Sequence, residues 1–316
     1  MEDRYSFEPN EINISNILSC SVKLSMTEEQ KICELAEVAR ETAAFVKALL
    51  TDGLNVYEAF SVLSETVNIH KDVCFDESLE DNKIHLKNFL HLSSVFDRSV
   101  FCSLLIEYLI SSGMLISEQS FFFDNSEDET FVYVKNQFSD EAYDVFSQEF
   151  SDPRVKYADS FKEAVRLVAD GSVSFCLLPI EERGVRLPTV EELISKTDSK
   201  INSVTPVFGY DGLADLKYAL VSKNIYLSDF TSEDDRYFEI RLPFDSENLS
   251  ALMVCAEEFD FKLFRVNTVS FKNNDDNVGY FSVVLKSLNG DFTKLLVFLT
   301  LFVPEYIPVG IYKNLE

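Results

Sequence analysis

The stretch of residues 173–182, Val-Ser-Phe-Cys-Leu-Leu-Pro-Ile-Glu-Glu, constrains the fold of this chain more than any other. Its apolar part is short and β-rich, as expected for a buried central strand. We expect Pro179 to stop this strand, because proline cannot donate to a sheet ladder. The segment before it has helical spacing and ends in glycine, which predicts a helix, a turn and then the strand. Glu181 and Glu182 would follow at the strand's carboxyl end, where open α/β sheets place ligands.

The charge of the chain limits the classes of partner that it can bind. With 28 Lys and Arg against 54 Asp and Glu, the net charge is −26. We expect neither nucleic acid nor a membrane as a partner, because nucleic acids and anionic lipids attract basic surfaces. The longest apolar stretch, 295–303, is about half of the roughly 20 residues that a membrane span needs. The first residues also lack the pattern of a signal peptide.

The use of cysteine, histidine and glycine favours a cytoplasmic protein without a metal or a cofactor. The 6 Cys form no CxxC pair and several lie in apolar runs, which is typical of reduced, buried thiols. His70, His85 and His91 lack the surrounding ligands of a metal site. Only 9 glycines are present, and the phosphate-binding patterns GxGxxG and GxxxxGK do not occur. We therefore expect no metal and no organic cofactor.

The spacing of apolar residues divides the chain into regions. Residues 1–26 show little periodicity and are expected to form a leader. Apolar stripes at helical spacing predict a helical module over 27–123. Strands and helices alternate over 129–228, as in an α/β lobe, and the order βαββαβ over 236–316 is the ferredoxin-like arrangement. The predicted class is a multidomain protein that combines a helical module with α/β and α+β parts.

The chain from residue 131 to its end resembles prephenate dehydratase followed by its ACT regulatory domain. The resemblance rests on five segments, which are Phe131-Val-Tyr-Val, Phe138-Ser-Asp-Glu-Ala, the predicted helix before Gly171, Leu177-Leu-Pro-Ile-Glu and Val309-Gly-Ile-Tyr. It implies a lyase of phenylalanine biosynthesis that turns prephenate into phenylpyruvate, water and carbon dioxide, without a cofactor, in a cleft between two lobes. The positions that match the family's catalytic motifs are Phe138, Ser139, Glu181, Lys217 and Tyr218.

The sequence departs from the family pattern at these motifs. The loop before Phe138 is short and lacks glycine, and Glu182 and Arg183 replace the Asn-Ser that follows Pro-Ile-Glu in the family. The signature Thr-Arg-Phe is matched only by Leu-Lys-Tyr at 216–218, and lysine cannot give a planar bidentate contact to a carboxylate. The second lobe of the family has no counterpart in the range 207–215. The lobe over 129–228 is therefore expected to be a reduced, single one.

The resemblance also implies a ligand, a partner and a second activity. The ACT domain of the family binds phenylalanine, so we expect an aromatic amino acid at this domain and a homodimer. The matching positions are Asn248, Ser250, Ala251 and Leu252, with serine in place of the family's glycine. The helical module has the position of chorismate mutase in bifunctional proteins. The basic residues that it offers for a dicarboxylate are Arg40, Lys47, Lys83, Lys87 and Arg98.

Three functions follow from these observations. The first is a non-catalytic regulatory or binding protein derived from prephenate dehydratase, because active-site features are lost while the apolar cores are kept. The alternative is an active prephenate dehydratase with Lys217 in place of the arginine, bifunctional if the helical module is a mutase. The third is an interaction protein whose helical module recruits a partner. Whether the chain is an enzyme stays open at this point.

Overall fold

The structure is a computed structural model of the 316-residue chain. It describes residues 28–68, 94–122, 129–210, 212, 215–226, 235–244, 246–273, 276–303 and 305–315. The expected leader, the three histidines, Lys83 and Lys87 lie outside these residues. The chain forms two compact units, one made of helices and one built on a sheet. Within the described residues, every helix is too short or too polar to cross a membrane.

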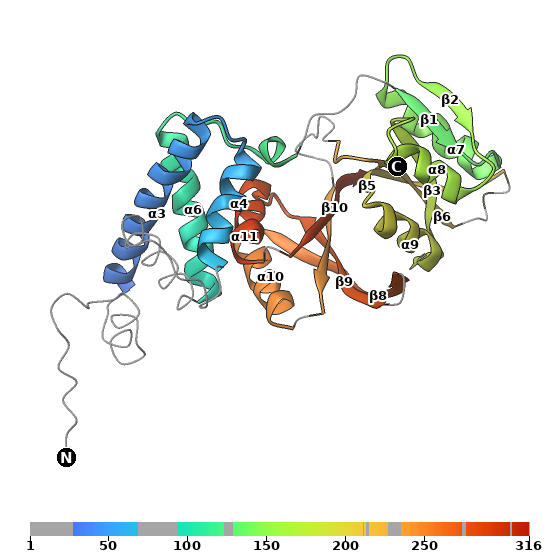
Figure 1. Ribbon diagram of the computed structural model, residues 1–316. Coiled ribbons are helices and arrows are strands. Elements are labelled where there is room, and N and C mark those ends of the chain that lie inside the picture. Colours follow the sequence, from blue (N-terminus) through green and yellow to red (C-terminus); the bar gives the residue numbers. More distant parts are fainter. Residues whose placement is uncertain are drawn as a thin grey trace. The chain divides into compact units, whose positions relative to one another are not determined.

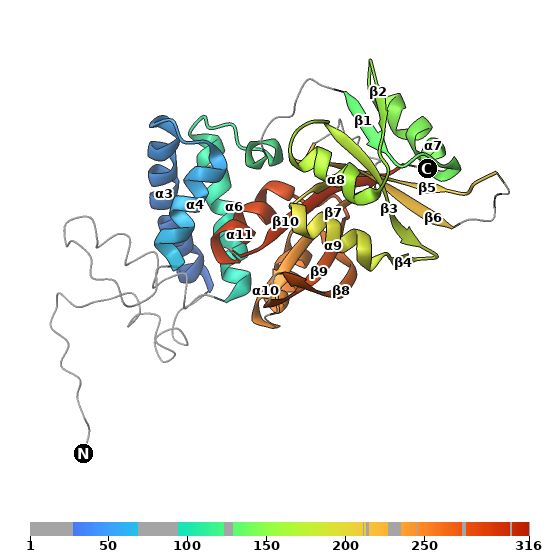
Figure 2. The ribbon, with the colours of Figure 1, turned by 45° about the vertical axis from the view of Figure 1, so that its right-hand side comes forward.

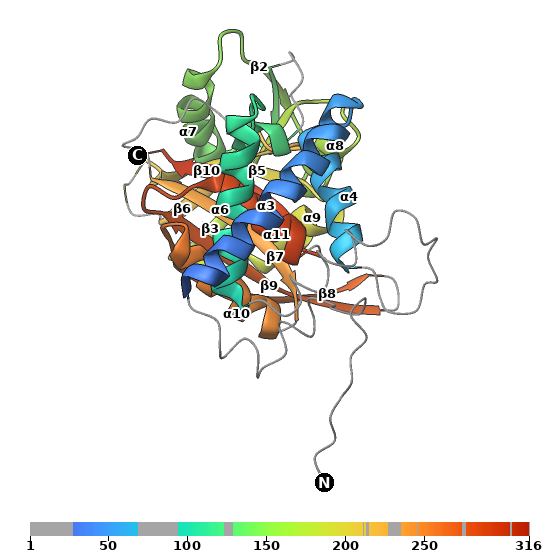
Figure 3. The same ribbon diagram turned by 90° about the vertical axis from the view of Figure 1, so that its left-hand side faces the viewer.

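The helical unit combines the N-terminal helices with a helix from the C-terminal region (Figure 3). Its elements are α3 (Glu28–Thr51), α4 (Val56–Asn68), α6 (Val95–Ser111), the 3-10 helix η1 (Glu118–Phe121) and α11 (Phe292–Phe302). Capping boxes begin two of the helices: Asn55 and Glu58 exchange hydrogen bonds before α4, and Ser94 caps α6. Helix α11 packs against α4 and α6 and is buried along most of its length. Helix α11 thereby contributes to the core of the helical unit, whereas the sequence pattern predicts a helical module formed by residues 27–123 alone.

The second unit is organised around one mixed sheet (Figures 1 and 2). The strand order is β2-β1-β3-β6-β5-β10-β7-β9-β8, and β4 pairs with β3. The strands are β1 (Thr130–Tyr133), β2 (Arg154–Tyr157), β3 (Phe175–Glu182), β4 (Val185–Arg186), β5 (Lys200–Val207), β6 (Leu216–Ser222), β7 (Arg236–Pro243), β8 (Phe261–Asn273), β9 (Asp276–Ser287) and β10 (Ile307–Asn314). Both regions that the sequence distinguishes, 129–228 and 236–316, contribute strands to this sheet.

Strand β3 runs through Pro179 to Glu182, so the expectation that the proline ends the strand was wrong. The pairing of β3 with β1 reaches only to Cys176. On the other side, the register against β6 shifts between Pro179 and Glu181. The missing N–H of the proline therefore lies beyond the last β1 partner and beside a bulge, where no ladder bond is lost. The extra length carries Glu181 further along the sheet.

Helices cover both faces of the strands from the α/β region. These helices are α7 (Gln137–Phe146), continued by η2 (Ser147–Glu149), on one face, and α8 (Phe161–Ala169) and α9 (Pro188–Thr197) on the other, while α10 (Ser246–Glu258) packs on β7 and β8. Because side chains alternate along a strand, Leu177 packs in the core under α7 and Leu178 in the core under α8 and α9. The latter core continues to Tyr237 and Tyr312 of the C-terminal strands.

The two sets of strands meet where β5 pairs in parallel with β10. A Cβ atom at Gly310 would lie 2.0 Å from the carbonyl oxygen of Ile201, so this approach requires glycine. Close by, the backbone N–H of Leu315 donates to the carbonyl oxygen of Val204 at 2.7 Å. The backbone contact between β5 and β10 thus brings the C-terminal strands against β3, β4 and β6.

Candidate functional site

A two-residue hairpin turns the end of β3 back on itself and positions the first two charged residues of the site. Arg183 and Gly184 form the turn with φ values of 51° and 76°, the left-handed values that a tight hairpin turn requires. Gly184 is therefore the second residue of the hairpin turn. The hairpin places Glu181 directly opposite Arg186. The acidic side chain of Glu181 and the basic side chain of Arg186 therefore lie on the same face of the sheet.

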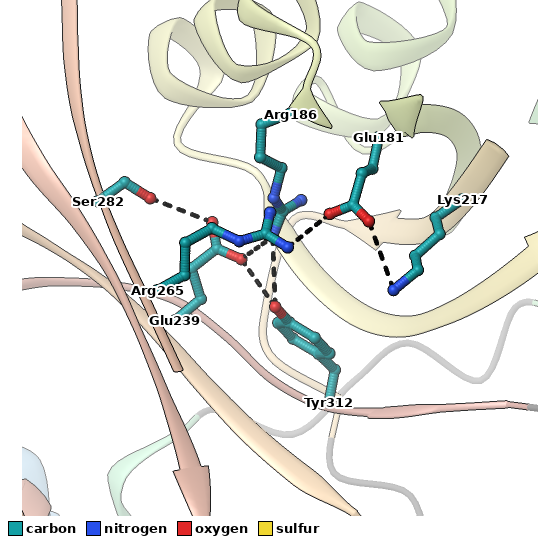
Figure 4. Close-up of polar contacts among 7 residues, drawn as sticks. All are labelled: Glu181, Arg186, Lys217, Glu239, Arg265, Ser282 and Tyr312. Carbon is teal, nitrogen blue, oxygen red and sulfur yellow. Dashed lines mark hydrogen bonds and ion pairs between the residues drawn. The ribbon is translucent and has the colours of Figure 1, made fainter. Parts of the chain in front are cut away.

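Arg186 binds Glu239 and Tyr312 from the C-terminal strands (Figure 4). Its Nη2 forms an ion pair with the carboxylate of Glu239, and the side chains of both residues are less than a tenth exposed. The hydroxyl of Tyr312 donates to Glu239 Oε2 at 2.9 Å, and the hydroxyl of Ser282 donates to Oε1 at 3.4 Å. Both carboxylate oxygens of Glu239 are therefore occupied.

Glu181 binds Arg265 and Lys217 on its two oxygens (Figure 4). Arg265 Nη2, from β8, lies 2.7 Å from Oε2, and Lys217 Nζ, from β6, lies 3.4 Å from Oε1. Glu181 is 5% exposed, so its carboxylate depends on these two partners far more than on bulk water. We call the following residues the charge cluster: Glu181, Arg186, Lys217, Glu239, Arg265, Ser282 and Tyr312.

The electrostatic environment favours the ionised forms of Glu181 and Arg186. Burial acts to raise the pKa of Glu181, but the hydrogen bond and charge of Arg265 outweigh it, and the pKa is lowered. Burial acts to lower the pKa of Arg186, but Glu239, Tyr312 and the other acidic groups around it together outweigh burial, and the pKa is raised. Burial also raises the pKa of Tyr312, which stays a neutral hydrogen-bond donor. Three cations thus face two carboxylates, and the cluster carries one excess positive charge.

The other predicted residues lie on the opposite face of the sheet. Tyr218 is 3% exposed and belongs to an apolar cluster under α7, which we call the ring cluster. Its members are Phe131, Tyr133, Ala142, Phe146, Phe175, Leu177, Val207, Tyr218 and Leu220. Phe138 packs against this cluster. Burial raises the pKa of the Tyr218 hydroxyl, so the side chain is neutral.

Ser139 is occupied in the capping of α7. Its hydroxyl donates to the carbonyl oxygen of Val134 at 2.7 Å and accepts the backbone N–H of Asn136 at 3.0 Å. The Asn136 side chain in turn accepts the backbone N–H groups of Phe138 and Ser139. This capping box begins the helix at Gln137. The serine hydroxyl is buried inside the cap and unavailable as a nucleophile.

The structure therefore joins two of the five predicted catalytic positions, Glu181 and Lys217, and separates them from the other three. Sequence reasoning missed five members of the charge cluster, which are Arg186, Glu239, Arg265, Ser282 and Tyr312. One signal was present for Glu239, because it stands inside the apolar alternation of β7. A charge at such a position indicates either a solvated face or a buried pair, and the sequence does not decide between them.

The positions matched to the ACT domain lie on α10. Leu252 is fully buried, Ser250 is exposed, and Asn248 and Ala251 are half-buried. Leu252 is therefore a core residue of the helix, and Ser250 is open to solvent. Ligand binding at these positions stays a prediction.

The basic residues of the helical unit have separate partners. Among those described, Arg40 pairs with Glu37, Lys47 donates to the carbonyl oxygen of Ser112, and Arg98 lies over the ring of Phe302. In the described part of the chain, no group of His, Cys, Asp and Glu has the arrangement of a metal site. The charge cluster is therefore the candidate functional site.

Comparisons with known proteins found similarity in structure alone. No protein-family model and no curated protein matches the sequence. Prephenate dehydratase from Streptococcus mutans is similar with a TM-score of 0.47 and 12% identity, over 59% of this chain and 99% of that chain. GqqA, a quorum quenching acylase, has a TM-score of 0.43 and 11% identity, over 60% of this chain and 96% of that chain.

A prephenate dehydratase from Arthrobacter aurescens, in complex with L-Phe, has a TM-score of 0.40 and 11% identity, over 58% of this chain and 89% of that chain. At such identities and TM-scores the similarity carries no information about activity, since one fold supports many functions. What this chain does has to be inferred from its own residues.

Proposed function

We propose that this protein is a non-catalytic regulatory or binding protein of the prephenate dehydratase type, linked to aromatic amino acid biosynthesis. The observation that carries the proposal is the state of Glu181. This carboxylate is buried, and Arg265 and Lys217 occupy its two oxygens. A catalytic carboxylate must reach the substrate and exchange protons near the working pH. Glu181 does neither, because its pKa is lowered and its oxygens are engaged.

The other family-matching residues support the same proposal. Lys217, in the position of the family's arginine, is directed to Glu181. Ser139 and Tyr218 lie across the sheet from it, one in a helix cap and one in the ring cluster. Catalysis by several groups requires them to converge on one reacting centre. The described residues that match the catalytic motifs do not converge.

The connection between β5 and β6 also supports a loss of catalysis. Strand β5 ends at Val207 and β6 begins at Leu216, and Glu141 accepts the backbone N–H groups of Phe208 and Gly209 after β5, both at 2.9 Å. In the resemblance this is the place of the second lobe. A cleft enzyme excludes water with two walls, and a connection with so few residues cannot form a second lobe.

The direct test is an assay of the purified full chain with prephenate, with phenylpyruvate as the measured product. We expect no turnover above that of buffer, while an authentic prephenate dehydratase assayed in parallel is active. Turnover that disappears in Lys217→Ala would overturn the proposal and establish the alternative activity.

A ligand panel tests the binding role that the proposal retains. Phenylalanine, tyrosine, tryptophan, prephenate and chorismate are added to the full chain and the unfolding temperature is measured. A ligand that binds only the folded state raises the Tm by mass action. We expect an aromatic amino acid to do so at α10, with a larger shift in Ser250→Gly, which restores the family's glycine. A flat panel in both proteins would contradict amino-acid binding.

The proposed homodimer is tested by sedimentation of the full chain at several protein concentrations. We expect the dimer to dominate at high concentration and to dissociate on dilution. A single monomeric species over the whole range would contradict this part of the proposal.

A further inference from the structure

A narrow cleft opens beside Glu181, within the sheet unit. The space that water can enter in this cleft has a volume of about 20 Å³, which is room for one or two water molecules. The residues that line it are Ile180, Glu181, Arg186, Val204, Lys217, Tyr237, Phe264, Arg265, Val284, Tyr312 and Asn314. The lining combines cations, one carboxylate and aromatic rings. This composition is typical of a site for a small anion with an apolar body.

The cations at the cleft can be reached from solvent, while the carboxylate between them cannot. The side chains of Lys217 and Arg265 are 32% and 21% exposed, against 7% for Glu181. Two cations share this one carboxylate, so a positive charge is left over (Figure 4). Nearby, Arg241 and Glu191 line a neighbouring cavity, and burial raises the pKa of Glu191. In a chain of net charge −26, this local excess of positive charge favours an incoming anion.

Arg265 also retains an unused donor. Its Nη2 binds Glu181, but its Nη1 is buried and meets no acceptor among the described residues. A buried donor without a partner costs about 1–3 kcal/mol, more when it is charged. The cluster therefore lacks one acceptor. Because Arg265 lines the cleft, a ligand oxygen bound beside its guanidinium would supply that acceptor.

An exposed aromatic ring forms the rim of the cleft. Phe264 is 50% exposed, and its ring packs edge-on against Tyr237 at 5.1 Å between centroids. The guanidinium of Arg265 lies 5.6 Å from the centre of the Phe264 ring. The cation and the ring are therefore fixed side by side. A ligand whose charged end reaches Arg265 would lay its apolar part on Phe264.

We propose that this cleft binds a small monocarboxylate, with the carboxylate held by Lys217 and Arg265 and the apolar body resting on Phe264. The single excess charge matches one carboxylate rather than a dianion such as phosphate. The small volume of the cleft suits a carboxylate. The apolar ring of the ligand would stay at the edge of the cleft, on Phe264. The proposal rests on the binding role proposed above, and it places a ligand at residues of β6, β7 and β8 rather than on α10.

The test compares three probes on the full chain at constant ionic strength: phenylacetate, its neutral amide phenylacetamide, and acetate. Phenylacetate should raise the Tm in a saturable way, because it has both the charge and the ring. Phenylacetamide should give no shift, and acetate a smaller shift at the same concentration. Equal shifts with phenylacetate and phenylacetamide would overturn the role of the cations. No shift with phenylacetate would overturn the proposal.

Variants locate the bound probe. Lys217→Gln removes the excess charge and should weaken phenylacetate binding by roughly tenfold, the usual effect of losing a charge-assisted hydrogen bond. Phe264→Ala should abolish the advantage of phenylacetate over acetate. Lys262→Gln is the matched control, because Lys262 is exposed on β8, the strand that carries Phe264. This variant should bind phenylacetate as the unmodified chain does. Unchanged affinity in both Lys217→Gln and Phe264→Ala would reject this cleft.

A combined variant covers the case in which single changes disturb folding. Glu181→Gln with Lys217→Gln and Arg265→Gln removes the carboxylate together with both cations that share it, so no buried charge is left alone. This variant should fold and should lose phenylacetate binding, and retained binding would reject the cleft. The outcome is separable from the proposed function: turnover of prephenate contradicts that function, whereas failure to bind phenylacetate without turnover contradicts only this inference.

Discussion

Two neighbouring residues on β6, Lys217 and Tyr218, enter opposite faces of the same sheet and meet opposite kinds of surroundings. Tyr218 joins the ring cluster, where aromatic and aliphatic side chains pack under α7. Lys217 joins the charge cluster, where each acidic side chain is matched to a cation. The two faces therefore stabilise the same strands by different physics.

The difference lies in how specific each face is about its partners. Apolar packing depends on volume and shape, and side chains of similar size can replace one another at little cost. A buried charge depends on one particular opposite charge, because desolvation is repaid only by that partner. The charge cluster should therefore fail when one member is removed and recover when a pair is removed together. The ring cluster has no such pairwise recovery.

The largest expected effect comes from removing Arg186, since this leaves Glu239 buried and unpaired. We expect Arg186→Met to lower the free energy of unfolding by about 3–5 kcal/mol, measured by urea denaturation of the full chain. The control is Arg183→Met at the exposed turn, which should change stability by less than about 0.5 kcal/mol.

The double variant Arg186→Met with Glu239→Leu tests the comparison directly. We expect it to recover most of the loss, because both charges leave the interior and are replaced by apolar groups of similar volume. If the double variant is as unstable as the single one, the cluster acts through packing, and the distinction between the two faces does not hold.

The next effect concerns the backbone contact that brings the C-terminal strands to the charge cluster. Gly310→Ala should cost about 1–3 kcal/mol or more, because its Cβ would lie 2.0 Å from the carbonyl oxygen of Ile201. The control is Gly279→Ala, whose Cβ would meet only the side chain of Phe244, which is half-exposed and can move. Equal losses in the two variants, measured by urea denaturation, would show that the β5–β10 contact is not special.

A smaller loss of stability is expected at the N-terminal cap of α7, the helix that covers the ring cluster. Ser139→Ala removes the acceptor for the backbone N–H of Asn136 and should cost about 1 kcal/mol. Hydrogen exchange should show faster opening in the first turn of α7 and no change in β8. Ser147→Ala, at the other end of the helix, is the control. Altered phenylacetate binding in Ser139→Ala would contradict the separation of the two faces.

The smallest effect is a dependence on pH that only the charge cluster should show. The folded pKa of Glu181 is lowered, so its contribution to stability is complete above the unfolded value of about 4.3 and is lost as the pH falls through the folded value. The difference in unfolding free energy between the unmodified chain and Glu181→Gln should shrink as the solution becomes more acidic than about pH 4.3. A constant difference down to strong acid would mean that Glu181 is not ionised in its pocket.

Much of the local structure was predictable because it depends on short-range patterns. The order βαββαβ over 236–316 is observed, since alternation and turn residues specify strands and helices locally. The exception on β3 is instructive. Pro179 is a valid stop signal only where a neighbouring strand requires its N–H, and the sequence does not reveal that β1 pairs no further than Cys176.

The candidate site was predictable only in part, because the sequence indicated Glu181 and Lys217 but none of the partners that join them from β4, β7 and β8. Glu181 and Lys217 were singled out from motifs, but their companion Arg265 is 84 residues from Glu181, and Glu239 is 53 residues from Arg186. Many Arg and Glu residues of this chain could form such pairs on charge alone. The choice among them follows from strand order and register, which depend on the whole sheet.

The sequence by itself determined the local elements, the acidic overall charge and the pair of carboxylates at the end of β3, of which the structure buries only Glu181. Each of these depends on neighbouring residues or on composition. The tertiary structure decided that α11 completes the helical unit, that one sheet joins both sets of strands, and that Glu181 is held by Arg265 and Lys217. These outcomes depend on which distant surfaces exclude water from one another, and a buried charge takes the partner that the fold brings within reach.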